Sequence, residues 1–460
     1  MNKTAIGVVG AVALAAAVVV GGAAWSGHVA EQRMQAGVTT WLSTLPVQVT
    51  ESTYDKGLFS SVQTVVVVIG CEESEGKTWT VRQHIQHGPF PGFTRIGWLA
   101  VDTEVMMPPE FREVLQNVPE RQALVNARTQ VGLFGGLTSH ITTPTLDFKD
   151  AGQGQGRFVS QGFDLRIKGA LSGRGTMSYD FAWPGLLAER NGEDADTRIK
   201  IGRLTSQGEG EGDGVRPVWL MIGRSTLAID QLDMLVTPKG SGKPSTFMLR
   251  DVKGDSLTTV ENQDLLTRVA TVTAQGQAND AKLTKIHLTT ALKRLHVPSY
   301  VQWMQQAGTP AAMCESQATP EAVLEQTQAS MAALLPHNPE FSIDKFDIEM
   351  DGVLGSLSTA FGTQGVTAEE ANSPDLRTVL FTKAYANGQA KVPLAWIEKF
   401  MIDSQPQRQA QDKAMLEAML GQVVDSGYVV RDGQFLSGEF KLDKGTLLVN
   451  GKPLGPQLTP

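Results

Sequence analysis

This chain of 460 residues has only two cysteines, few aromatic residues and no block of lysine or arginine. Aromatic residues make up 7% of it, and Asp plus Glu outnumber Lys plus Arg by 48 to 40, a formal net charge of -8. Nucleic-acid binders gain affinity by neutralising phosphates, so this acidic balance speaks against a nucleic-acid partner. The hydrophobic fraction of 41% is typical of a globular protein, and the length corresponds to about two or three folding units.

Familiar catalytic and cofactor motifs are also absent from the sequence. It contains no GxSxG, HExxH or GxxxxGK[ST] motif. The glycine-rich stretch 152–156 precedes a predicted strand, whereas a phosphate cradle needs the N-terminus of a helix. We therefore assign no catalytic residue and no cofactor, and a non-enzymatic role comes first. An envelope hydrolase whose catalytic residues are scattered along the chain is the alternative.

Two patterns resemble metal sites without completing them. Residues 208–214 alternate glycine with carboxylates, as a calcium loop does, but Leu220 stands where that loop needs a closing Glu. We interpret this run as a solvated hairpin end. His84 and His87 have the spacing of a metal pair on a helix, but the surrounding alternation predicts a strand, in which they face opposite sides. The sequence therefore predicts no metal site.

An apolar segment, Ala5–Ala24, carries no charged or strongly polar side chain. At about 1.5 Å per residue it can cross a hydrocarbon core of about 30 Å. Because Lys3 precedes it, the positive-inside rule predicts a cytoplasmic tip at residues 1–4, a transmembrane anchor at residues 5–25 and export of the remaining chain. The small residues before Trp25 leave a cleaved signal, and hence a soluble periplasmic protein, as the alternative.

The rest of the chain is predicted to be rich in β-strands. Alternating β-branched segments and glycine-containing turns indicate an α+β fold, in which antiparallel sheets are accompanied by a few amphipathic helices. We expect an amphipathic connector helix at residues 26–46 and a first β-rich module at residues 47–225. A second, α+β module is expected at residues 226–460, with helices near residues 319–335 and 406–425.

One internal similarity links Leu227–Met234 with Phe341–Ile348. Both segments alternate apolar and polar residues and carry Asp at the same two places, which indicates either two related modules or a coincidence of amphipathic patterning. Alternation puts the first and third residues of each segment, Phe341 among them, on a buried face, and Asp230 and Asp344 on the wetter face. It leaves open whether such apolar faces form a packed core, the commoner outcome, or an open groove.

Two further features concern structure rather than chemistry. In His87-Gly88-Pro89-Phe90-Pro91 the glycine supplies backbone freedom and the prolines fix the direction of the chain, so we interpret this motif as a structural corner. Cys71 and Cys314 either form one disulfide in an oxidising compartment or are two unrelated buried residues.

Several landmarks occur in a characteristic order: the segment from Ala24 to Arg33, Tyr54–Ser61, the His87–Pro91 motif and Val449–Pro453. Together they resemble the YdgA-like family of Gram-negative envelope proteins, which carry domain of unknown function 945. The resemblance implies a protein that is anchored in the inner membrane, faces the periplasm and can self-associate. It implies no catalytic residues.

These features predict a non-enzymatic, membrane-anchored periplasmic protein that acts as an envelope scaffold or binding protein. Its expected partners are the inner membrane through residues 5–25, a second copy of the chain, another envelope protein, or a hydrophobic ligand such as a lipid. The biochemical activity and the ligand are not specified by any motif.

Overall fold

The computed structural model describes most of the chain between residues 47 and 454. The described ranges are 47–69, 77–93, 96–107, 123–150, 156–213, 221–240, 242–262, 264–307, 332–373, 375–401, 409–443 and 445–454. The predicted anchor and connector helix, Cys71, Cys314 and most of the helix predicted near 319–335 lie outside these ranges. Among the described helices, none is both long and apolar enough to cross a membrane.

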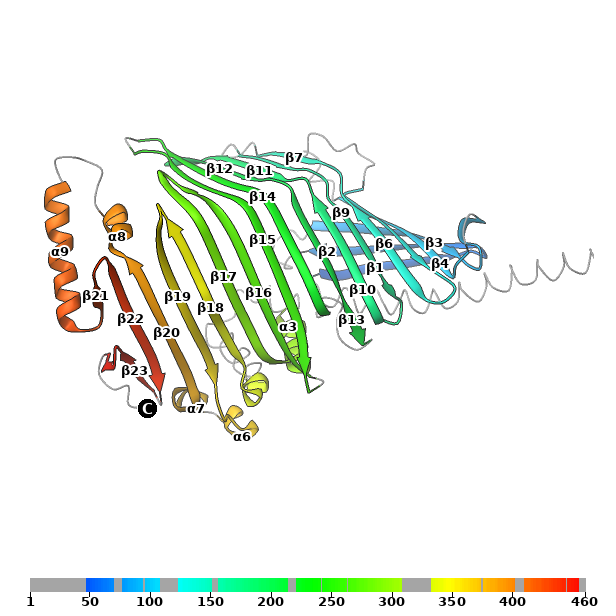
Figure 1. Ribbon diagram of the computed structural model, residues 1–460. Helices are drawn as coiled ribbons and strands as arrows, with labels where there is room; N and C mark the ends of the chain where they lie inside the picture. The colour runs from blue at the N-terminus through cyan, green and yellow to red at the C-terminus, as the bar shows by residue number, and fades with distance from the viewer. Residues whose placement is uncertain are drawn as a thin grey trace, which may run out of the picture. The chain divides into compact units, whose positions relative to one another are not determined.

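The chain divides into two compact units, and strands dominate each of them (Figure 1). Unit 1 comprises residues 1–223, 236–242 and 302–318, and unit 2 comprises residues 224–235, 243–301 and 319–460. Strand β14 (Ile222–Pro238) contributes to both units. The strand pairs described below are antiparallel and the helices are few, so the prediction of a β-rich antiparallel fold is confirmed.

Unit 1 contains a meandering antiparallel sheet in the order β1–β2–β3–β4–β5–β6–β9–β10–β13. A second set of strands pairs in the order β7–β8–β11–β12. The bounds are β1 (Val47–Lys56), β2 (Ser60–Ile69), β3 (Lys77–His87), β4 (Leu99–Met106), β5 (Val125–Val131), β6 (Gly136–Thr142), β7 (Leu146–Asp150), β8 (Gly156–Ser160), β9 (Asp164–Ala170), β10 (Arg174–Trp183), β11 (Leu186–Asn191), β12 (Ala195–Ile201) and β13 (Leu204–Asp213). A short 3-10 turn, η1 (Pro91–Phe93), lies between β3 and β4.

Strand β2 shows why these segments adopt extended structure. It is rich in valine, whose branched side chain suits a pleated sheet. Every second residue from Ser61 to Val67 is buried, and Val65 and Val67 pack with Trp79 and Val81 of the neighbouring strand β3. The residues between them are half-buried, which is the two-residue period of a strand.

Unit 2 contains an antiparallel sheet of longer strands in the order β15–β16–β17–β18–β19–β20–β22, and β21 and β23 also pair with β22. A final short strand, β24, pairs with β23. The bounds are β15 (Ser245–Glu261), β16 (Leu265–Ala278), β17 (Ala281–His296), β18 (Glu340–Met350), β19 (Val353–Thr363), β20 (Ala384–Pro393), β21 (Val430–Asp432), β22 (Phe435–Asp443), β23 (Thr446–Val449) and β24 (Lys452–Pro453).

The described helices pack at strand ends and along one edge of the unit 2 sheet (Figure 1). One cluster joins the 3-10 turn η4 with α6 and α7 through Leu335, Ala371 and Leu376. In another, Leu416 and Leu420 of α9 pack on Leu394 of α8. Helix α9 occupies the region where the sequence predicts a helix near residues 406–425. The bounds are α3 (Val297–Ala307), η4 (Leu335–His337), α6 (Ala368–Ala371), α7 (Leu376–Lys383), α8 (Leu394–Met401) and α9 (Gln409–Ser426).

The glycine and carboxylate run does not form a hairpin end. Through Asp213 it belongs to β13, which pairs residue by residue with β10. Gly208 and Gly210 are buried, whereas Glu209 and Glu211 are exposed. The alternation that suggested a turn is therefore the inside and outside pattern of a strand.

The two similar segments both lie in unit 2, in β14 and in β18. Asp230 and Asp344 are exposed, as the alternation predicts. The predicted burial of Phe341 is wrong, because its side chain is 44% exposed while Ser342, on the other face, is 2% exposed. The apolar face that includes Phe341 is not a packed core at this position.

A charged cluster connects β17, β18 and β20 at one end of the unit 2 sheet. The ammonium group of Lys293 donates a hydrogen bond of 2.8 Å to Oε1 of Glu340, and the Tyr385 hydroxyl donates to Oε2. These two hydrogen bonds hold the pKa of the Glu340 carboxyl below its usual value. Ionised Glu340 therefore stabilises the folded chain.

Replacing Glu340 with glutamine is expected to lower the free energy of unfolding by about 1–3 kcal/mol at pH 7. The folded-state pKa lies below the unfolded value of about 4.3, so the contribution of the carboxylate is complete above that pH and is lost as the pH falls through the folded pKa. Urea unfolding of both proteins at several pH values measures this, with exposed Glu104→Gln as the control. A difference between wild type and Glu340→Gln that persists undiminished in acid would contradict this role.

Candidate functional site

The unit 2 sheet carries an apolar row that crosses seven neighbouring strands. The backbone register pairs each residue of this row with the next, and paired residues share one face of a sheet. The row consists of Gly254, Val272, Leu288, Phe346, Leu357, Ala390 and Gly438. None of these residues has a polar side chain, so a continuous apolar strip runs across the strands.

The flanking rows on this face extend the apolar surface. Phe341 pairs directly with Phe361, and the two side chains are 44% and 45% exposed. The Phe361 ring lies 6.4 Å from the ring of Phe440, centroid to centroid. Between them and the central row lie smaller residues with single hydroxyl groups, such as Thr359, which is buried. We call this surface the apolar face.

Helix α8 closes one end of the apolar face. Trp396 packs against the buried cluster of Ala281, Leu283 and Met350, and its ring lies against Gly355 of β19. Its indole Nε1 is buried and has no hydrogen-bond partner in the described part of the chain. Because this N–H is buried, a molecule on the apolar face does not reach it. Hydrocarbon contacts therefore close this end of the apolar face.

The opposite face of the same strands is polar. One residue along the chain from the apolar row, the register aligns a second row of Lys253, Thr273, His287, Asp347, Ser356, Lys391 and Ser437. Asp347 lies 3.3 Å from the ammonium of Lys345 and 3.9 Å from that of Lys285. The two faces of the sheet thus differ sharply in chemistry, with only the apolar one suited to hydrocarbon.

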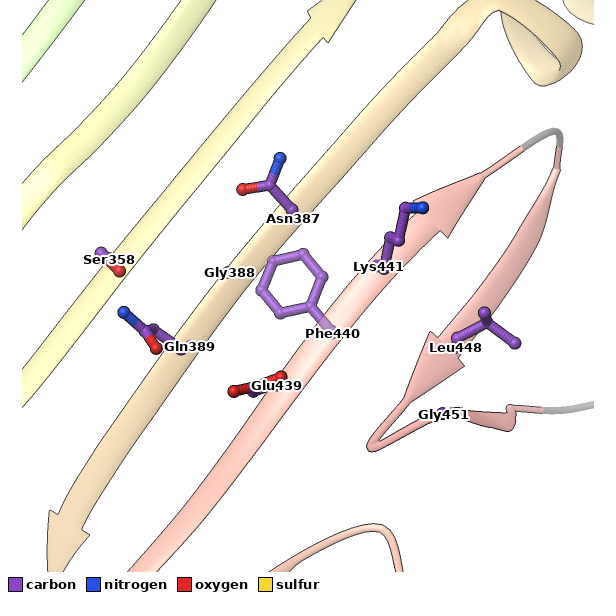
Figure 2. Close-up of a pocket in the computed structure, with 9 residues that line it drawn as sticks. All are labelled: Ser358, Asn387, Gly388, Gln389, Glu439, Phe440, Lys441, Leu448 and Gly451. Atoms are coloured by element: carbon purple, nitrogen blue, oxygen red, sulfur yellow. The ribbon is translucent and has the colours of Figure 1, made fainter.

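Two hollows of about 440 and 490 Å³ lie beside each other on β19, β20 and β22, and they share Ser358, Gln389 and Glu439. Figure 2 shows the first hollow, whose described lining is Ser358, Asn387, Gly388, Gln389, Glu439, Phe440, Lys441, Leu448 and Gly451. This lining contains no histidine or cysteine to activate a nucleophile or to ligate a soft metal. Its chemistry is that of a shallow polar surface.

The His87–Pro91 motif forms the connection after β3. The His87 ring is buried and lies within hydrogen-bond distance of the Ser61 hydroxyl, Nε2 to Oγ 3.0 Å, and of the Leu58 carbonyl, Nδ1 to O 3.2 Å. Burial lowers the pKa of His87. A neutral ring with the proton on Nδ1 donates to Leu58 and accepts from Ser61, which satisfies both nitrogens.

This Ser61–His87 pair has the residue types of a hydrolase but not the setting. Both side chains are only 2% exposed, so a substrate does not reach the hydroxyl. The second ring nitrogen of His87 bonds a backbone carbonyl, where a catalytic triad places a carboxylate. His87, at the end of β3, therefore connects this strand to Ser61 of β2 and to Leu58 in the β1–β2 turn.

The other sequence-derived candidates are not brought together. His84 is exposed and His87 buried on the same strand, and they lie on opposite faces. Glu211 accepts a hydrogen bond of 3.0 Å from the Thr176 hydroxyl. Within the described ranges, no group of three or more His, Cys, Asp and Glu side chains could hold a metal ion.

The structure thus defines a strand-rich protein whose described residues include one continuous, partly exposed apolar surface, the apolar face of unit 2. A family model described as "Bacterial protein of unknown function (DUF945)" matches residues 1–457, and the chain belongs to this family. No curated protein and no solved structure matches the chain.

Proposed function

We propose that this protein is a non-enzymatic, membrane-anchored component of the bacterial envelope that binds the acyl chain of a lipid on the apolar face of unit 2. In this proposal residues 5–25 hold it in the inner membrane as a YdgA-like single-pass protein, and the bulk of the chain lies in the periplasm. The observation that carries the proposal is the register that aligns Val272, Leu288, Phe346 and Leu357 next to the exposed pair Phe341 and Phe361.

The dimensions of the apolar face favour an acyl chain as its occupant. Strands in a sheet lie about 4.8 Å apart, so a row across seven strands is about 29 Å long. One leaflet of a membrane contributes about half of a hydrocarbon core of about 30 Å, so an acyl chain fits along the row. Removing such a surface from water is favourable by about 25 cal/mol per Å² of apolar area.

Substituting Leu357 with aspartate is expected to weaken binding of a fluorescent palmitate analogue to the purified full chain by about tenfold or more, because it places a charge in the middle of the apolar row. Ser356→Asp is the matched control. It adds the same charge one residue earlier on β19, on the polar face, and should leave binding unchanged. Fluorescence titration measures both affinities, and circular dichroism verifies that both variants fold. Equal affinities for Leu357→Asp and Ser356→Asp would refute binding on this face.

The proposed topology has its own test. A periplasmic reporter enzyme fused after Asp150 is expected to be active in intact cells, and the chain should remain in the membrane fraction after salt washing. Both results follow from Lys3 preceding an uncleaved apolar span. Recovery of a soluble mature chain that begins at Trp25 would establish a cleaved signal instead.

A further inference from the structure

Four turns of unit 1 carry large apolar side chains that point into solvent. The most exposed are Phe134 at 102%, Phe93 at 70%, Ile96 at 67% and Leu171 at 56%. Exposed residues of the same kind accompany them in these turns. We call the whole set the apolar tips, which are Leu58, Phe59, Phe90, Phe93, Ile96, Leu133, Phe134 and Leu171.

The sheet topology gathers these turns at one end. Neighbouring strands are antiparallel, so the connections that follow β1, β3, β5 and β9 all leave the same end of the meander. Hydrogen bonds join adjacent turns: Trp98 N–H donates to the Val131 carbonyl at 2.8 Å, and Leu171 N–H donates to the Gly135 carbonyl at 2.8 Å. The rings of Phe59 and Phe93 lie 5.5 Å apart. The apolar tips are therefore one contiguous feature, not isolated side chains.

The composition of these turns is unusual for a protein surface. Surface turns are ordinarily polar, rich in Asn, Asp and Ser. The turn sequences 57–59, 88–98, 132–135 and 171–173 contain one charged residue, Arg95, and consist largely of Gly, Leu, Phe and Pro. Trp98 lies among them, with its indole N–H donated to the Leu133 carbonyl. Exposed apolar clusters of this kind mark a surface that is covered in the working protein.

We infer that the apolar tips insert into the surface of a lipid bilayer. Phe134 and Phe93 project from turns, so lipid chains can surround each ring, whereas a protein partner would need a separate pocket for each. Phe, Leu and Trp are the residues with which proteins enter the interfacial region of membranes. This inference concerns unit 1 and does not depend on lipid binding by unit 2.

The proposed anchor at residues 5–25, on which this step rests, would place a bilayer within reach. The apolar segment Ala5–Ala24 ends well before β1 begins at Val47. As the expected connector helix, residues 26–46 would span about 30 Å, which is about the length of a strand of unit 1. A hollow of about 410 Å³ lies beside the apolar tips and is lined by Ile96, Leu137 and Lys168 among others. It offers apolar side chains to the hydrocarbon of a lipid and one ammonium group to its headgroup. The second membrane contact would fix the orientation of unit 1 at the bilayer.

A photo-crosslinking experiment tests this inference in the full chain. The photoreactive residue p-benzoylphenylalanine replaces Phe134 in one variant and Asn126 in the other, an exposed position toward the opposite end of β5. Each variant is reconstituted in vesicles of phosphatidylethanolamine and phosphatidylglycerol, irradiated and analysed by mass spectrometry. We expect the yield of phospholipid adduct at position 134 to be at least about tenfold higher than at position 126. Transfer of an aromatic side chain from water into lipid is favourable enough to give a ratio of this size.

Further variants show whether the adduct at position 134 depends on insertion of the neighbouring tips. Adding Leu133→Asp and Leu171→Asp should reduce this adduct to the level seen at position 126. The control Gln161→Asp, at an exposed position just before β9 and so at the opposite end of the meander, should leave it high. Equal adducts at positions 134 and 126 would overturn the inference. So would crosslinks from position 134 to a second copy of the chain in place of lipid. Either failure leaves the comparison of Leu357→Asp with Ser356→Asp untouched.

Discussion

Replacing Gly88 with valine is expected to lower the free energy of unfolding by about 3 kcal/mol or more. A Cβ atom at this position would lie 2.2 Å from the Gly97 carbonyl oxygen and 2.7 Å from that of Trp98. Both neighbours are backbone atoms, so no side-chain rotation relieves the clash. Gly88 N–H also donates a hydrogen bond of 2.7 Å to the Trp98 carbonyl, and separating the two segments would break it. The sequence alone suggests a smaller cost, of about 1–3 kcal/mol.

Gly136→Val is the matched control for this prediction. Gly136 begins β6, and a Cβ atom at this position would meet nothing within 4 Å, so the same substitution should change stability by about 0.5 kcal/mol or less. Urea unfolding measured on both variants gives the comparison. If Gly88→Val proves as stable as Gly136→Val, the segments around Gly88 and around Gly97 and Trp98 move apart without a loss of stability, and the prediction is wrong. The expected cost of His87→Ala is intermediate, since the Ser61 hydroxyl and Leu58 carbonyl lose a partner.

The period of a strand was predictable from sequence, whereas its neighbours were not. Alternation identifies β2 and also the side of β18 that carries Phe341 and Ile343. The pairing of Phe346 with Leu288 joins β18 to β17, two strands far apart in the chain. Its pairing with Leu357 depends on an extra residue in β18, where the register shifts between Ile343 and Phe346. No local pattern specifies that shift.

Exposure was the second property that the sequence did not reveal. Apolar alternation tells which residues share a face, but another layer has to pack on that face before it becomes core. In the described part of unit 2 the helices lie at strand ends and along an edge, so Phe341 and Phe361 remain exposed. The apolar tips escaped prediction for a related reason. Leu58, Phe134 and Leu171 lie far apart in the sequence, and only the meander brings them to one end of a sheet.

A valine at position 210 is expected to destabilise the chain by about 3 kcal/mol or more, whereas valine at the next position, in Glu211→Val, should cost no more than about 1 kcal/mol. A Cβ atom on Gly210 would lie 2.1 Å from the Ile222 carbonyl oxygen and 2.5 Å from Cγ of Met221, so a neighbouring backbone occupies the space of a side chain. Glu211 is exposed and loses only its hydrogen bond to the Thr176 hydroxyl.

This pair of substitutions distinguishes a strand from a cation-binding loop. In a strand the cost alternates with position, since Gly210 faces the packed side and Glu211 faces solvent. In a calcium loop the carboxylate would be the sensitive residue, and its loss would abolish any stabilisation by added calcium. Thermal unfolding of both variants, with and without calcium, measures the two patterns. Because β13 pairs with β10 along this segment, we expect the alternating cost and no response to calcium. Gly210 and Gly212 lack side chains where the backbones of Ile222 and Gly173 pass in contact with the strand.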